Sequence, residues 1–194
     1  MLGGEFTSTR RSLLGIFTGA VAVPWSALAI GKVGSASDLA KGLPPIMRTP
    51  EGRTLSRFRY HNAEGFFRTV EAGYLNATPV MLYNVGIVLQ LGLSSHLLDV
   101  GFDDAWCARH IGLHVVKSLR YANVTGLDAN SPELARLVAL LSPYSRWRDA
   151  DIRGAEASCP FRDVQIKQLT RDLLERVREV TGHPRPRSKA RSRE

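Results

Sequence analysis

The sequence has few of the features that usually reveal a chemistry. It has two cysteines, Cys107 and Cys159, and their spacing fits neither a zinc finger nor a thioredoxin-type redox motif. It contains no glycine-rich phosphate loop, nucleophile elbow, HExxH motif or dinucleotide-binding fingerprint. Glu64 and Glu71 share one face of an expected helix, but two carboxylates alone do not make an acid–base pair. A binding or accessory protein is therefore favoured over an enzyme.

The chain also lacks a basic surface large enough to indicate a nucleic-acid platform. The formal net charge is +8, yet residues 183–194 hold five basic side chains against one acid. Residues 30–182 carry 19 basic and 16 acidic side chains, so the body is only mildly basic. Nucleic acid is consequently not the expected partner of the body. Basic residues alternating with Pro and Ser predict that 183–194 form a disordered tail, either solubilising or attracted to phosphate groups.

Residues 1–29 show the ordered features of a cleavable export signal. Arg10 and Arg11, followed by Ser12 and two leucines, resemble the twin-arginine motif. The apolar run 13–23 has the length of a signal's hydrophobic region, whereas a bilayer span needs about 20 apolar residues. The sequence Ala-Leu-Ala then predicts cleavage after Ala29. The resemblance implies the twin-arginine translocation machinery as a partner, and a periplasmic or secreted bacterial protein.

Apolar periodicity predicts an all-α fold, a small bundle of about five helices around a central apolar helix. The central segment is apolar on nearly every face, but its polar residues and lack of basic flanks favour a buried core helix over an integral membrane span. Gly86 and Gly92 within it would let neighbouring elements approach closely. The expected helices span about 61–75, 80–98, 103–121, 131–141 and 163–181.

Proline-rich stretches set the expected domain boundaries. Pro44-Pro45 and Thr49-Pro50 disfavour regular helix, which predicts an extended linker over 30–57. The helical domain is then expected over 58–182, between this linker and the basic tail 183–194. Trp147 stands between two arginines and is expected to pin its loop to the core, although it could also stack on a ligand ring.

Four potential metal ligands recur at helical spacing. On one continuous helix Asp103, Cys107, His110 and His114 would lie within a narrow arc. A thiolate with imidazoles suits zinc or copper. The alternative is that these residues only pack, and Gly112 between the histidines could break the helix. In an oxidising compartment Cys107 and Cys159 could instead form a disulfide, or both could be buried as small apolar residues.

A helix-turn-helix interpretation of residues 101–121 is a further alternative. Ala108 and Gly112 stand where such motifs place alanine and the turn glycine, but Ser118 stands where an apolar residue should anchor the second helix. A single helix with one glycine would explain the same residues. In this alternative the helix-turn-helix segment would belong to a cytosolic DNA-binding protein that starts at Met47. Its basic residues would be Lys117, Arg120, Arg185 and Arg187.

Together these features predict a small exported helical protein that binds a ligand or assists another protein. The cytosolic DNA-binding protein and an exported metal-binding protein are the two alternatives.

Overall fold

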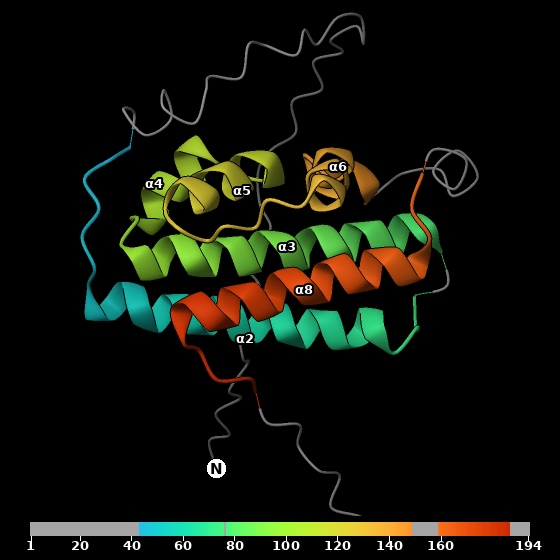
Figure 1. The fold of residues 1–194 in the computed structure, drawn as a ribbon, viewed down its shortest axis with the longest axis horizontal. Helices are drawn as coiled ribbons and strands as arrows, with labels where there is room; N and C mark the ends of the chain where they lie inside the picture. Colours follow the sequence, from blue (N-terminus) through green and yellow to red (C-terminus); the bar gives the residue numbers. More distant parts are fainter. Residues whose placement is uncertain (1–42, 76, 149–158, 187–194) are drawn as a thin grey trace, which may run out of the picture. The chain divides into compact units, whose positions relative to one another are not determined.

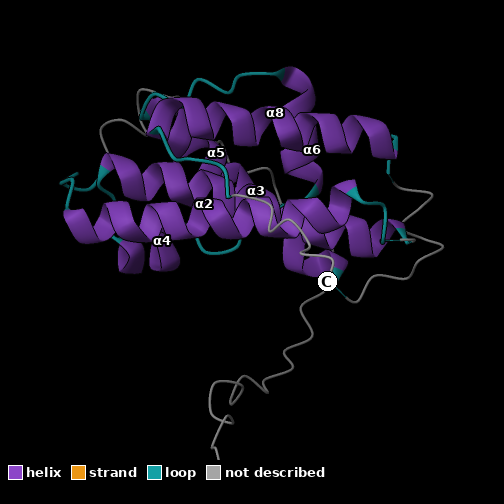
Figure 2. Ribbon diagram, turned by 90° about the horizontal axis from the view of Figure 1, so that it is seen from below, coloured by secondary structure: helices purple, strands orange, loops and turns teal. Residues whose placement is uncertain are grey.

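The computed structural model describes residues 43–75, 77–148 and 159–186 (Figure 1). These residues contain six α-helices and one 3-10 helix, and no strand occurs among them (Figure 2). The expectation of an all-α chain is therefore confirmed for the described part, whereas the signal segment 1–29 and residues 187–194 lie outside it. The elements are α2 (Pro50–Glu71), α3 (Thr78–Val100), α4 (Asp104–His110), α5 (Val115–Val124), α6 (Pro132–Leu140), η1 (Tyr144–Trp147) and α8 (Asp163–Thr181).

Helix α3 occupies the centre of the described residues. It packs against α2, α5, η1 and α8, and in Figure 1 it runs between α2 and α8 on one side and α4 to α6 on the other. Its length and composition would allow it to cross a membrane, but 67% of its most apolar window is buried inside the protein. Core helices of this kind bury apolar side chains on every face, which is what the sequence pattern predicted.

Helix α2 begins earlier than the sequence suggested, so the extended linker does not reach residue 57. The Thr49 hydroxyl accepts a hydrogen bond from the Gly52 backbone N–H at 3.0 Å, and Pro50 occupies the first turn. A proline fits there because the first helical N–H groups have no intrahelical partner. The Thr49-Pro50 pair therefore starts a helix, whereas the prediction treated it as a helix breaker.

The two glycines of α3 allow close contacts, as expected. A Cβ atom at Gly86 would lie 2.2 Å from Tyr144 Cβ, and one at Gly92 would lie 3.0 Å from Leu174 Cδ2. The missing side chain at Gly86 thus lets η1 pack closely on α3, and the one at Gly92 does the same for α8. Trp147, the last residue of η1, is buried and donates its indole N–H to the Leu140 carbonyl at 3.1 Å, so it pins the loop as predicted.

The helix expected over 103–121 is divided into α4 and α5. Ile111 and Gly112 both donate their backbone N–H groups to the Cys107 carbonyl, and Gly112 has a φ of +58°. This left-handed conformation is readily adopted by glycine and ends α4 at His110. His114 then precedes α5 in an extended conformation. Both the single-helix interpretation and the arc of four metal ligands depended on a continuous helix here.

The chain continues to pack after α8, which corrects the prediction of a disordered tail from residue 183. His183 is 1% exposed, and its Nε2 lies 2.6 Å from Ser56 Oγ on α2. The His61 ring bonds the Pro184 carbonyl at 3.1 Å. Arg185 forms ion pairs with Glu64 and Glu175. The prediction rested on the average composition of residues 183–194. It failed because the single side chain of His183 is buried against α2 and holds the start of this segment in place.

Candidate functional site

The four predicted metal ligands are not assembled into a site. The Asp103 carboxylate accepts the Trp106 backbone N–H at 2.8 Å, and the exposed His110 ring stacks on Trp106 with centroids 4.6 Å apart. Cys107 is buried, and His114 lies beyond the end of α4. Within the described residues, no group of three His, Cys, Asp or Glu side chains is arranged to hold a metal ion.

Both cysteines are free thiols in this structure, and the possible disulfide between them stays a prediction for an oxidising compartment. Cys159 donates to the Phe161 carbonyl at 3.5 Å, whereas Cys107 is the buried residue of α4. Burial, with a further contribution from Asp104, raises the pKa of the Cys107 thiol to about 12. Cys107 is therefore protonated at neutral pH and is a poor nucleophile.

Two of the four basic residues of the helix-turn-helix alternative, Lys117 and Arg185, have other partners. The Lys117 ammonium donates to the His110 carbonyl at 3.3 Å, and Arg120 is half-buried. Arg185 neutralises acids of α2 and α8, and Arg187 lies outside the described residues. The helix does break at Gly112, as a helix-turn-helix motif requires. The contacts above, however, do not gather the basic side chains on one DNA-binding surface.

A buried cluster on α2, α3 and the C-terminal segment contains a serine, a histidine and a carboxylate. Sequence reasoning missed it because its members are far apart in the chain. Ser56 and His183 are fully or almost fully buried, and Asp99 Oδ1 lies 3.9 Å from the same His183 Nε2 that meets Ser56. A hydrolytic triad needs the carboxylate on Nδ1, which here has no partner among the described residues. The cluster therefore anchors the C-terminal segment and lacks both the geometry and the access for catalysis.

The two carboxylates of α2 are likewise committed to structure. The Arg171 guanidinium donates to both oxygens of Glu64 at 3.1 Å and lies 2.8 Å from Glu71 Oε1. Glu64 is 4% exposed and also accepts the Tyr60 hydroxyl at 2.9 Å. This ion-pair network joins α2 to α8 and leaves neither acid available for proton transfer.

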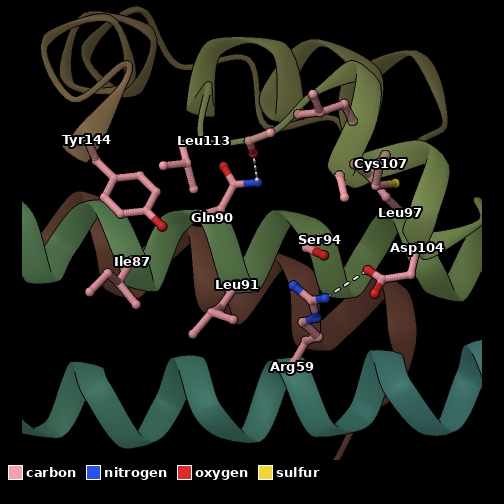
Figure 3. A pocket seen from close by; sticks show the side chains of 13 residues that line it. Arg59, Ile87, Gln90, Leu91, Ser94, Leu97, Asp104, Cys107, Leu113 and Tyr144 are labelled. Atoms are coloured by element: carbon pink, nitrogen blue, oxygen red, sulfur yellow. Dashed lines mark hydrogen bonds and ion pairs between the residues drawn. The ribbon is translucent and has the colours of Figure 1, made fainter. Parts of the chain in front are cut away.

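A cavity of about 400 Å³ lies above α3, between α2 and the α4 region (Figure 3). The side chains of Ile87 and Leu91 form its apolar floor on α3. Arg59 comes from α2, Leu113 from the turn between α4 and α5, and Tyr144 from η1. Figure 3 shows these side chains spread along one face of α3, with Arg59 rising from α2 and Tyr144 coming from η1. The cavity exists because α2, α5, η1 and α8 cover the other faces of α3 and leave this strip open.

Charged and polar groups interrupt the apolar lining at a few points. Arg59 Nη2 donates to Asp104 Oδ1 at 2.8 Å, which links α2 to α4 across the cavity. The Gln90 amide donates to the Gly112 carbonyl at 3.0 Å and accepts the Ser118 hydroxyl at 3.1 Å, so both of its ends are used. Ser94 lines the cavity and is 4% exposed. Its hydroxyl has no hydrogen-bond partner in the described ranges.

The titratable groups of this lining are held in neutral or paired states. The thiol in it is protonated, and the carboxylate is paired with an arginine. Burial also raises the pKa of the Tyr144 hydroxyl, so that group stays neutral. An apolar cavity with a small number of placed polar groups is the usual form of a small-molecule site.

Sequence reasoning did not identify Arg59, Ser94, Asp104 or Tyr144 as members of a site. They come from four elements, and their convergence depends on helix packing that no local spacing encodes. The one available signal was Gly86, whose small size predicted a close neighbour and which admits Tyr144. No protein-family model matches the chain, and no curated protein or solved structure shows significant similarity to it.

Proposed function

We propose that this protein is an exported helical binding protein that holds a small, mostly apolar ligand in the cavity above α3. The observation that carries the proposal is the cavity itself, about 400 Å³ in volume with an apolar floor and few polar groups. Binding sites for small molecules typically begin at roughly 300 Å³. The protonated Cys107 thiol and the paired Asp104 carboxylate favour binding over catalysis.

The energetics of the floor support the same function. Ile87 and Leu91 are half-buried, whereas the other large aliphatic side chains of α3 between Val80 and Val100 are fully buried. Covering apolar surface stabilises by roughly 25 cal/mol per Å². An apolar ligand over these two side chains would complete the burial of α3 without any change in the helices.

Filling the floor should weaken the binding of an apolar probe. We expect 1-aminoanthracene, a neutral fluorophore that brightens in apolar sites, to bind the wild-type protein. Leu91→Trp should weaken that binding by about tenfold or more, because the indole occupies the space above α3. The matched control is Val164→Trp, which adds the same indole at a position on α8 that is 78% exposed.

Circular dichroism and thermal unfolding establish that both variants fold, and Ile87→Phe fills the same floor if Leu91→Trp does not fold. Equal probe affinity in the wild type and in a folded floor-filling variant would show that the cavity is not the binding site.

Export is the second part of the proposal, and residues 1–29 support it. The twin-arginine pathway recognises the arginine pair, so replacing Arg10 and Arg11 with lysine should leave the precursor in the cytoplasm. Cell fractionation and mass measurement provide the test, with Ile30 expected as the first residue of the exported wild-type protein. Cytoplasmic wild-type protein, or a chain that begins at Met47, would refute export.

A further inference from the structure

One cationic donor and two hydroxyl groups are among the polar groups that line the cavity. Arg59 is the only basic side chain in its lining and can only donate. The hydroxyls of Ser94 and Tyr144 also border the cavity, and neither has a hydrogen-bond partner among the described residues. On the acceptor side the Gln90 oxygen is already engaged with Ser118, which leaves the Asp104 carboxylate as the only charged acceptor in the lining.

The two side chains of the Arg59–Asp104 ion pair differ in their exposure to water. The Asp104 side chain is 44% exposed and the Arg59 side chain is 29% exposed. If the pair separates, Asp104 can be hydrated at the rim of the cavity, whereas Arg59 remains against the helical wall and needs another anion. Exchange of Asp104 for a ligand anion therefore costs less than capture of a ligand cation by Asp104.

Ser94 gives an independent indication of a polar ligand group. Its side chain is 4% exposed, directed into the cavity and unpaired within the described residues. The hydroxyl oxygen is not among the fully buried atoms that lack a partner, so it is accessible from the cavity and can donate a hydrogen bond to a ligand oxygen. Arginine is the side chain best suited to a carboxylate, because its planar fork can donate two parallel hydrogen bonds.

We infer that the ligand is a carboxylate with an apolar tail, and that its carboxylate replaces Asp104 on Arg59 while its tail lies over Ile87 and Leu91. This inference rests on the proposed binding function. Ser94 donates a further hydrogen bond to the carboxylate, and Leu113 and Tyr144 bound the tail. Asp104 acts as an internal competitor, which holds Arg59 in place while no ligand is bound.

The chemistry of the ligand can be tested with three probes of equal chain length. Calorimetric titration of the mature protein with decanoate and decylamine below their micelle concentrations, and with decan-1-ol below its solubility limit, should give the tightest binding for decanoate. We expect decanoate to bind at least tenfold more tightly than decan-1-ol, and decylamine to bind most weakly.

Two substitutions in the ion pair should change the decanoate affinity in opposite directions. Arg59→Gln should weaken decanoate binding at least tenfold and leave decan-1-ol binding nearly unchanged. Asp104→Asn should strengthen decanoate binding severalfold, because the competing carboxylate is removed. The control is Arg57→Gln, which removes the same charge from an exposed position of α2 and should change neither affinity.

The outcomes separate the two proposals. Decan-1-ol binding as tightly as decanoate, or decanoate affinity unchanged in Arg59→Gln, would overturn the carboxylate inference and leave the binding function standing. If none of the three probes binds the folded wild-type protein, the binding function fails as well.

Discussion

Replacing Gly86 with alanine should destabilise the protein by about 2 kcal/mol and weaken ligand binding. The new Cβ would lie 2.2 Å from Tyr144 Cβ and 2.7 Å from Tyr144 Cγ, so η1 must move away from α3. Overpacking of this kind typically costs roughly 1–3 kcal/mol, against a helix-propensity gain of up to about 1 kcal/mol. Because Tyr144 bounds the cavity, the same displacement should reduce probe affinity at least fivefold.

Gly65→Ala is the matched control for this change. Gly65 lies within α2, and a Cβ atom there would meet no atom within 4 Å. The substitution should stabilise the protein by about 0.5–1 kcal/mol through helix propensity alone. Urea unfolding measures both variants. A Gly86→Ala protein as stable as Gly65→Ala would contradict the close packing of η1 on α3.

Replacing Gly101 with alanine should have the largest effect on stability, a loss of about 3 kcal/mol. Gly101 has a φ of +111°, and a Cβ atom there would lie 2.5 Å from the Met47 carbonyl carbon and 2.7 Å from the Arg48 nitrogen. Left-handed strain accounts for roughly 1–2 kcal/mol, and the clash with backbone for a similar amount. The Met47 N–H bonds the Gly101 carbonyl at 3.1 Å, so that segment cannot retreat without losing a hydrogen bond.

Gly126→Ala separates strain from clash. Gly126 has a φ of +96°, close to that of Gly101, but a Cβ atom there would meet nothing within 4 Å. It should lose only the strain energy, about 1 kcal/mol. Equal losses of unfolding free energy in the two variants would mean that residues 47 and 48 do not pack against the end of α3.

The sequence predicted best where several local signals agree. α8 spans Asp163–Thr181 as expected, because its apolar stripe and the following Gly182 both mark its extent. α6 begins after Ser131, whose hydroxyl accepts the Leu134 N–H at 3.2 Å. Here the cap, the first-turn proline and the apolar face agree, so the prediction needed no tertiary information.

Prediction failed where one residue type can serve two opposite purposes. Pro50 can end a helix or begin one, and the Thr49 cap decides for beginning. Gly112 can lie within a helix or end it, and here its left-handed backbone conformation ends α4. His183 was assigned to the tail on composition, although Ser56, 127 positions earlier in the chain, provides its buried partner. In each case the deciding contact or conformation lies outside the pattern itself.

The candidate site could not be predicted because its residues have no shared spacing. Arg59 and Asp104 are 45 positions apart, and they meet because α2 packs along α3 and α4 follows the end of α3 after a short turn. The sequence instead emphasised Cys107, His110 and His114, whose spacing is conspicuous. Spacing indicates a shared helix face only while the helix continues, and this one ends at His110.

A crystal structure of the mature protein grown with decanoate tests the central claim most directly. We expect electron density for the tail over Ile87 and Leu91, the carboxylate within hydrogen-bond distance of Arg59, and Asp104 turned toward solvent. An empty cavity, with decanoate absent or bound elsewhere in crystals whose solution contains it at saturating concentration, would contradict the proposed site.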